Sequence, residues 1–223
     1  MSTAVSRTLG VALGLFLVVA LNTAAREFHT DQFDHSPLNP SWTFFAPGGG
    51  SYDLRDGWVH FIAPGPLWIL AEDEASMPPM ILIEPPADDV FTFETRIRFH
   101  NVAPLASAGL VAIRKDLESR MILEYSPTVG GGMVLLTWLA GALHGGGSAQ
   151  VGLTGDTWLR VELPSDMPFT EPRFFYRQGG EEDPWIDATA PGVVFPFRLP
   201  ADIIKPRFLP GEYWIGLYVD GGS

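Results

Sequence analysis

FFYRQGGEEDPW, at residues 174–185, decides the fold class of this chain. An aromatic run is followed by a glycine pair and three acidic residues, and the segment ends at Trp185. Strand-forming residues that lead into a glycine-containing turn and out to a second apolar residue are typical of a β-hairpin. We therefore predict two antiparallel strands here, and we expect Trp185 to be a packing residue.

The chain after residue 26 continues this pattern. Glycine and proline separate short stretches rich in Val, Ile, Phe, Tyr and Trp, and no segment keeps a helical period for three turns. Many short strands with turn signals between them predict an all-β sandwich or barrel. Three glycine runs, at residues 48–50, 130–132 and 145–147, lack the Lys-Ser/Thr pair of a phosphate-binding loop, so we predict turns there.

Alternating residues in two segments, 91–99 and 157–163, predict which side chains face the core. Successive side chains of a strand point to opposite faces of the sheet. The apolar set, expected inward, includes Phe93, Ile97, Leu159 and Val161. The opposite set, expected outward, includes Glu94, Arg96, Trp158 and Arg160. In the last strand, the same rule places Ile215 and Leu217 on one side and Trp214 and Tyr218 on the other.

The first residues predict export. Arg7 precedes an apolar run at residues 9–21, and small residues at 23–25 match the pattern that signal peptidase accepts. We therefore expect residues 1–25 to be a secretory signal peptide and residues 26–223 to be one domain, secreted or extracytoplasmic. The alternative is an uncleaved N-terminal anchor. After signal cleavage we expect no membrane span, because no second apolar run is long enough.

Charge and composition narrow the partners. The net charge is -12, so the surface repels phosphate backbones, and we expect no nucleic acid partner. A neutral or cationic ligand is easier to accommodate. The chain has no cysteine, which excludes a disulfide framework, thiol catalysis and cysteine zinc sites.

Several motifs occur in the order found in one superfamily. They are "D-x-F-D" with "L-x-P-x-W" at residues 31–34 and 38–42, a "D-G-x-L-x-L"-like strand at 56–61, "A-G-L-x-x-R"-like residues at 108–114, "E-Y-S" at 124–126 and a "W-L-R-L"-like strand at 158–161. In this order the chain resembles the concanavalin A-like lectin/glucanase superfamily. Within it, the chain is similar to enolase-regulator-type domains and to the C-terminal accessory domains of β-xylosidases.

The resemblance implies an all-β, two-sheet antiparallel jelly-roll sandwich whose concave sheet binds or cleaves glycans. Such domains usually carry a further strand after the equivalent of residues 213–219, and this sequence ends at Ser223. We therefore expect the final strand to be lacking, or the open edge to be covered by something else. An open sheet edge favours self-association.

Three functions stay open. The first is a secreted, non-catalytic carbohydrate-binding or accessory module for a poly- or oligosaccharide, and the second is a structural or protein-interaction domain without a small ligand. The third is a glycan-cleaving enzyme that uses Glu94 and Glu124. Charged and aromatic residues on strands with an apolar opposite side suit sugar binding. These candidate ligand-binding residues are Glu94, Arg96, Glu124, Trp138, Trp158 and Arg160. Their alternative role is in cross-strand ion pairs and packing.

The N-terminal carboxylates offer a candidate metal site. Asp31 and Asp34 lie close to His29 and His35, and carboxylates with backbone carbonyls are suitable Ca²⁺ ligands. We expect a structural calcium ion here or, alternatively, a turn or cap made by the aspartates. We predict no other cofactor.

Overall fold

A computed structural model describes most of the domain. At residues 91, 132–139, 142–150 and 163 it describes the backbone alone. The predicted signal peptide at residues 1–25 lies outside the described residues. The described residues are 31–34, 36–63, 69, 71, 73–85, 91–98, 106–126, 132–139, 142–150, 156–163, 173–188 and 211–220.

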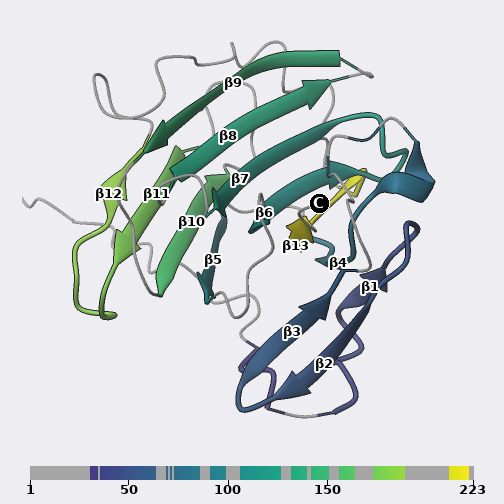
Figure 1. Ribbon diagram of the computed structural model, residues 1–223, viewed down its shortest axis with the longest axis horizontal. Helices are drawn as coiled ribbons and strands as arrows, with labels where there is room; N and C mark the ends of the chain where they lie inside the picture. Colours follow the sequence, from purple (N-terminus) through teal and green to yellow (C-terminus); the bar gives the residue numbers. More distant parts are fainter. Residues whose placement is uncertain are drawn as a thin grey trace, which may run out of the picture.

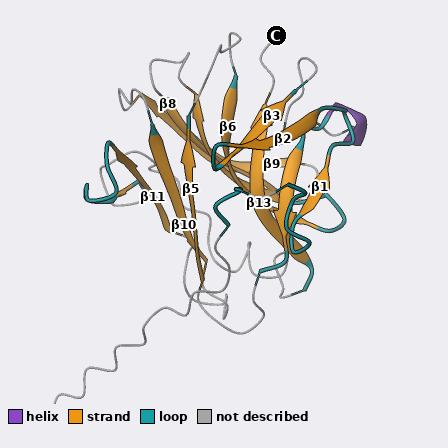
Figure 2. Cartoon of the chain, turned by 90° about the horizontal axis from the view of Figure 1, so that it is seen from below, coloured by secondary structure: helices purple, strands orange, loops and turns teal. Residues whose placement is uncertain are grey.

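The strands form two main antiparallel sheets and a separate hairpin (Figures 1 and 2). In spatial order, the seven-stranded sheet contains β1 (Thr43–Phe45), β4 (Met80–Ile83), β13 (Tyr213–Asp220), β6 (Ser107–Arg114), β7 (Arg120–Ser126), β8 (Gly132–Leu139) and β9 (Ala142–Gln150). The four-stranded sheet contains β12 (Ile186–Asp187), β11 (Arg173–Gln178), β10 (Thr157–Leu163) and β5 (Phe91–Ile97). The predicted antiparallel jelly-roll sandwich is confirmed.

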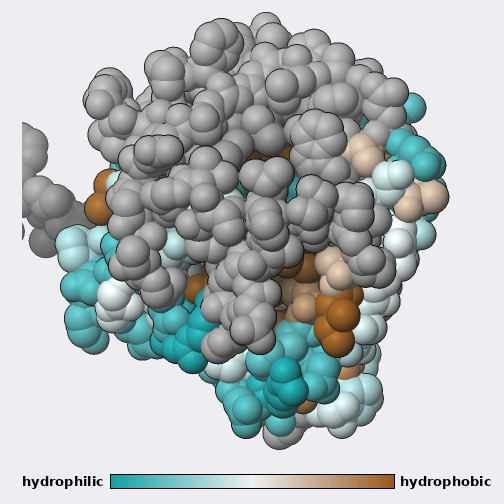
Figure 3. All heavy atoms as spheres, in the orientation of Figure 1, coloured by the Kyte–Doolittle hydropathy of each residue, from teal (hydrophilic) through white to brown (hydrophobic). Residues whose placement is uncertain are grey.

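The hairpin of β2 (Ser51–Arg55) and β3 (Trp58–Ile62) extends beyond β1 and β4 in Figure 1. Its tip has a hydrophilic surface, which Figure 3 shows in the same orientation. The other short element is a 3-10 helix, η1 (Glu74–Ser76), in which the Ala75 amide donates a hydrogen bond to the side chain of the N-cap residue Asp73.

The main core lies between the two sheets. Apolar side chains from both sheets meet there and are less than a tenth exposed, among them Ile81, Leu110, Leu123, Ile215, Ile97, Leu159, Val161 and Phe174. The predicted inward sets of β5 and β10 therefore face this core, and so does the side of β13 that carries Ile215 and Leu217, because alternate side chains of a strand share a face.

The outer face of the seven-stranded sheet carries a second apolar layer. Its members from the strands include Met80, Leu82, Val111, Ile113, Ile122 and Tyr218. Ile69 and Met77 pack on them and are fully buried. Strands covered on both faces explain why β4 and the middle of β6 are continuously apolar.

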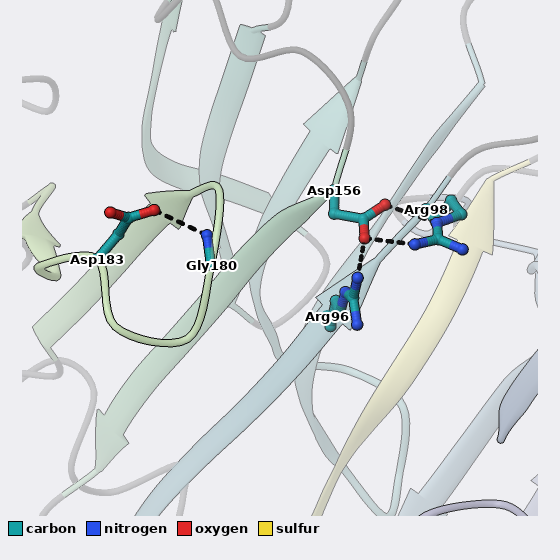
Figure 4. Close-up of polar contacts among 5 residues, drawn as sticks. All are labelled: Arg96, Arg98, Asp156, Gly180 and Asp183. Atoms are coloured by element: carbon teal, nitrogen blue, oxygen red, sulfur yellow. Dashed lines mark hydrogen bonds and ion pairs between the residues drawn. The ribbon is translucent and has the colours of Figure 1, made fainter.

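The predicted hairpin at residues 174–185 is confirmed. Phe175 and Tyr176 of β11 pair with Asp187 and Ile186 of β12. Gly179 has a φ of +100°, which favours glycine, and a Cβ there would lie 2.2 Å from a carboxylate oxygen of Asp183. That oxygen accepts a 2.7 Å hydrogen bond from the Gly180 amide, which closes the turn (Figure 4).

One sequence prediction needs correction. Residues 145–147 are not a turn, because they pair with residues 135–137 inside β9 and β8. Glycine disfavours strands because it has no side chain to pack, but the pairing with β8 outweighs that preference here. The run at residues 48–50 does follow a turn, closed by a bond from the Gly49 amide to the Ala46 carbonyl. The last described strand, β13, is paired on both sides by β4 and β6, and the edge strands of the two main sheets are β1, β9, β12 and β5 among the described strands. Self-association through an open sheet edge stays a prediction.

The close approach of central strands requires glycine at two positions. A Cβ at Gly109 would lie 2.0 Å from the Leu123 carbonyl oxygen, and one at Gly216 would lie 2.1 Å from the Ile81 carbonyl oxygen. We expect Gly109→Ala to lower the free energy of unfolding by about 1–3 kcal/mol, since the strands must move apart. Urea denaturation measures this change.

Gly180→Ala is the control, because the nearest atom to a Cβ there is 4.0 Å away. Equal stability losses in the two variants would contradict the steric explanation.

Candidate functional site

The outer face of the four-stranded sheet carries an alternating series of guanidinium groups and aromatic rings, which we call the arginine–aromatic ladder. Each guanidinium carbon lies 4.5–5.9 Å from the centroid of a neighbouring ring, a distance typical of cation–π contacts. The members in order are Arg98, Trp58, Arg96, Trp158, Arg177, Trp185, Arg160, Phe175 and Arg173.

Carboxylates pair with the ladder arginines. Asp156 binds Arg96 and Arg98 together, with hydrogen bonds of 2.6 and 2.5 Å from Arg98 (Figure 4). The hydrogen bond from Arg98 lowers the pKa of Asp156 to about 2, against the opposing effect of burial. Glu94 lies 3.0 Å from the Arg160 Nε atom.

Four of the predicted ligand-binding residues, Glu94, Arg96, Trp158 and Arg160, are therefore brought together, but they contact one another. The Trp158 ring lies near the guanidinium groups of both Arg96 and Arg177, at 5.4 and 4.5 Å. Rings flanked in this way are not free platforms for a sugar. The arrangement matches the alternative role of cross-strand ion pairs.

Glu124 lies on a different face from the other predicted residues. Its neighbours Leu123 and Tyr125 point into the main core, so Glu124 faces outward from the seven-stranded sheet. Glu94 faces outward from the other sheet, and the whole core separates the two carboxylates. The predicted catalytic pair of Glu94 and Glu124 is therefore wrong. Trp138 is the register partner of Arg120, and its side chain lies outside the described residues.

Glu124 belongs to a buried group of polar residues, which we call the acid cluster: Glu124, Ser107, Tyr218 and Asp220. The Glu124 Oε2 atom accepts a 2.5 Å hydrogen bond from the Tyr218 hydroxyl and a 3.0 Å bond from the Ser107 hydroxyl. Asp220 is the register partner of Ser107.

The geometry of the cluster depends on Gly109. Gly109 of β6 is the register partner of both Glu124 and Tyr218, and it presents no side chain between them. Tyr218 therefore reaches across β6 to the carboxylate. This hydrogen bond therefore joins β7 and β13, the two strands that flank β6.

Burial shifts the protonation of the cluster. Desolvation raises the pKa of Glu124, although the hydrogen bonds from Tyr218 and Ser107 oppose the shift. Desolvation, with the charge of Glu124, raises the pKa of Asp220 to about 8. Asp220 is therefore mainly neutral at pH 7. Strongly raised carboxyl pKa values with a specific charged neighbour are typical of functional sites.

A short covering segment, Ile69 with Ala71, is fixed beside the acid cluster, and we call it the Ile69 strap. The Asp220 Oδ1 atom accepts a 3.0 Å hydrogen bond from the Ile69 amide. Arg120, only 3% exposed, donates to the carbonyls of Ile69 and Ala71 and also to that of Leu117. Both polar groups of the Ile69 backbone are thus held by side chains of the sheet.

Ser107, Arg120 and Asp220 were not predicted as site residues from the sequence. One signal was present: Tyr218 was predicted on the side of its strand opposite to Ile215 and Leu217, and Asp220 follows two residues later. Side chains two residues apart on a strand lie on the same face, so Asp220 shares the face of Tyr218.

The predicted calcium ligand Asp31 has a structural role. Its Oδ1 atom accepts a 2.8 Å bond from the Phe33 amide, and its Oδ2 atom accepts a 3.0 Å bond from the Trp42 indole. In the part of the chain that the structure describes, no three His, Cys, Asp or Glu side chains form a metal-binding group. His29 and His35 lie outside the described residues, and calcium binding at Asp31 and Asp34 stays a prediction.

Within the described ranges, no helix is long and apolar enough to cross a membrane.

Three solved structures are similar to this chain. The GH43 BlXynB protein from Bacillus licheniformis has a TM-score of 0.64 and 16% sequence identity, over 86% of this chain and 36% of its own. GH43B of a Bacteroides ovatus xyloglucan PUL has a TM-score of 0.61 and 16% identity, over 86% and 35%. A GH43_12 retrieved from a capybara gut metagenome has a TM-score of 0.59 and 13% identity, over 86% and 35%.

No protein-family model matches the sequence, and no curated protein does. The identities to the solved structures are so low that the likeness shows the fold alone. The chain spans about a third of the length of each of these three proteins.

The Asp156 ion pairs predict acid sensitivity. Because the folded pKa of about 2 is below the ordinary 3.8, the stabilisation is complete above about pH 4 and is lost as the pH falls through 2. We expect Asp156→Asn to flatten the fall in melting temperature between pH 4 and pH 2. Glu182→Gln, which removes one exposed charge, is the control. An unchanged pH profile in Asp156→Asn would contradict this role.

The Asp31 contacts predict that Asp31 contributes to the stability of the fold independently of calcium. Asp31→Ala leaves the Trp42 indole without this acceptor, and we expect a loss of about 1–3 kcal/mol in unfolding free energy. Urea denaturation with Ca²⁺ and with a chelator should give equal losses. Stabilisation by Ca²⁺ in the parent chain that is absent from the variant would indicate instead that Asp31 binds the ion.

Proposed function

We propose that this chain is a secreted, non-catalytic carbohydrate-binding module whose ligand contacts the acid cluster on the outer face of the seven-stranded sheet. The observation that carries the proposal is the Glu124 carboxylate, which is half-buried beside the second apolar layer and bonded to two hydroxyl groups. Burying a carboxylate opposes folding, and an apolar residue would serve a purely structural face better.

Glu124 is the accessible member of the cluster. Glu124 is partly exposed, whereas Ser107, Tyr218 and Asp220 are at most 6% exposed. A carboxylate fixed by neighbouring hydroxyl donors can accept hydrogen bonds from sugar hydroxyls in a defined direction. The net charge of -12 favours a neutral glycan over an anionic one.

The comparisons support a glycan ligand through the fold. The similar chains include GH43B of a xyloglucan PUL, and the present chain corresponds to about a third of that protein. A part of this size is consistent with an accessory domain of the β-xylosidase type, to which the sequence is similar. The apolar run at residues 9–21 supports export of the chain. An exported domain can meet extracellular polysaccharides.

A glycan-cleaving enzyme is the second candidate, with a different carboxyl pair from the one expected from the sequence. Glu124 and Asp220 share a face and influence each other electrostatically. A carboxyl group with a pKa of about 8 is protonated at neutral pH, which suits a general acid. Release of reducing sugar from xyloglucan or xylan, lost in Glu124→Gln, would favour this function.

Binding to xyloglucan, xylan and mannan tests the proposal. We expect the mature chain to bind at least one of these neutral polysaccharides, and Glu124→Ala to weaken that binding at least tenfold, or about 1.4 kcal/mol. Affinity electrophoresis and calorimetry measure the change, and near-ultraviolet circular dichroism verifies that the variant is folded.

Trp158→Ala is the matched control, because Trp158 lies on the arginine–aromatic ladder of the other sheet. It should retain binding. Loss of binding in Trp158→Ala with retention in Glu124→Ala would place the ligand on the ladder. A chain that binds none of the three glycans would support a structural or interaction domain, for which self-association through a sheet edge is the expected partner mode.

A further inference from the structure

The two oxygen atoms of the Glu124 carboxylate have different surroundings. Both hydrogen bonds that reach this carboxylate, from the hydroxyl groups of Tyr218 and Ser107, end at Oε2. Among the described residues, no donor reaches Oε1. Oε1 is also not one of the fully buried polar atoms that lack a partner, so it is in contact with solvent. Glu124 therefore offers one oxygen to a ligand, while the protein occupies the other.

Tyr218 is held more firmly than the carboxylate to which it donates. Its side chain is 1% exposed and belongs to the second apolar layer. Its register partners on the two flanking strands are Met80 and Gly109. A buried tyrosine packs through its ring and needs a hydrogen-bond partner for its hydroxyl group. The 2.5 Å bond from this fixed hydroxyl group therefore determines the direction of the flexible Glu124 side chain.

We propose that Tyr218 is a positioning residue, which holds Oε2 of Glu124 so that Oε1 accepts a hydrogen bond from an unsubstituted sugar hydroxyl. Tyr218 has this role only if Glu124 binds a glycan as proposed above. An ionised carboxylate accepts hydrogen bonds and donates none, so the ligand has to supply the proton. An acetylated sugar hydroxyl has lost its donor and keeps acceptor oxygens alone. The site therefore selects deacetylated polysaccharide over the acetylated form.

The same hydrogen bonds help to keep Glu124 ionised. Desolvation raises the pKa of Glu124, and the bonds from Tyr218 and Ser107 lower it. Of the other described ionisable groups on this face, Asp220 on β13 has a pKa of about 8 and is mainly neutral at pH 7, and Arg120 on β7 donates to backbone carbonyls. Loss of the Tyr218 hydroxyl therefore raises the pKa of Glu124, and the carboxylate takes up its proton at a higher pH.

Tyr218→Phe tests the positioning role without a ligand, because it keeps the buried ring and removes the hydroxyl group alone. NMR titration of the Glu124 carboxyl carbon in the mature chain should give a higher midpoint pH in Tyr218→Phe than in the parent chain. Ser107→Ala, which removes the second donor, should shift the midpoint in the same direction. Tyr176→Phe, which removes a hydroxyl group from the other sheet, should leave it unchanged. An unchanged midpoint in Tyr218→Phe would overturn the proposal.

Xyloglucan, xylan and mannan, each compared before and after chemical acetylation, test the class of ligand. We expect the parent chain at pH 7 to bind the deacetylated form about tenfold more tightly, because the acetylated form leaves the Oε1 atom unpaired. Glu124→Gln has a side-chain amide that can also donate, so it should lose this preference. On acidification, binding should fail at a higher pH in Tyr218→Phe than in the parent chain.

The outcomes separate this proposal from the proposed function. Equal affinity of the parent chain for the two forms, with binding still weakened in Glu124→Ala, would overturn the selection for free hydroxyl groups and leave glycan binding in place. Identical pH profiles of binding in Tyr218→Phe and the parent chain would overturn the positioning role. A chain that binds neither form of any of the three polysaccharides would contradict the proposed function and this inference together.

Discussion

The hydrogen bond from Tyr218 to Glu124 links the central strands of the larger sheet at the proposed binding site. It joins β13 to β7 across β6, and it forms because Gly109 leaves the space between them empty. The same carboxylate also accepts from Ser107 on β6, so three neighbouring strands meet at one buried acid. The central strands of the larger sheet are thus arranged around a polar group that an apolar sheet does not require for its stability.

The two outer faces of the sandwich differ in how they treat charge. On the smaller sheet, carboxylates form ion pairs with Arg96, Arg98 and Arg160, and aromatic rings flank Arg177, which explains how so acidic a chain carries a row of cations there. On the larger sheet, Glu124 and Asp220 have no cationic partner among the residues that the structure describes, and desolvation raises their pKa values. Carboxyl groups whose pKa values are shifted by burial and by a neighbouring charge are the better candidates for ligand binding or chemistry.

Much of the fold could be predicted because strand patterns are local. The alternation at Phe93 and Ile97 and at Leu159 and Val161 correctly identified the core face of β5 and β10. Alternation says nothing about which sheet a strand joins, so Glu94 and Glu124 were wrongly expected on one surface. The acid cluster was hidden for the same reason: Ser107, Glu124 and Asp220 come from strands that are distant in sequence and become neighbours only through the strand order. A tryptophan on a polar strand face looked like a sugar platform, but cross-strand arginines that no local pattern reveals flank it.

Mapping the bound glycan on the folded chain by NMR tests directly whether the acid cluster binds it. Titration of the isotope-labelled mature chain with xyloglucan oligosaccharides should shift the amide signals of Ser107, Glu124 and Tyr218 in one saturable process. Signals of Trp158 and Arg177 on the arginine–aromatic ladder should stay in place. Saturable shifts confined to the signals of the arginine–aromatic ladder, with the signals of the acid cluster unchanged, would contradict glycan binding at the acid cluster.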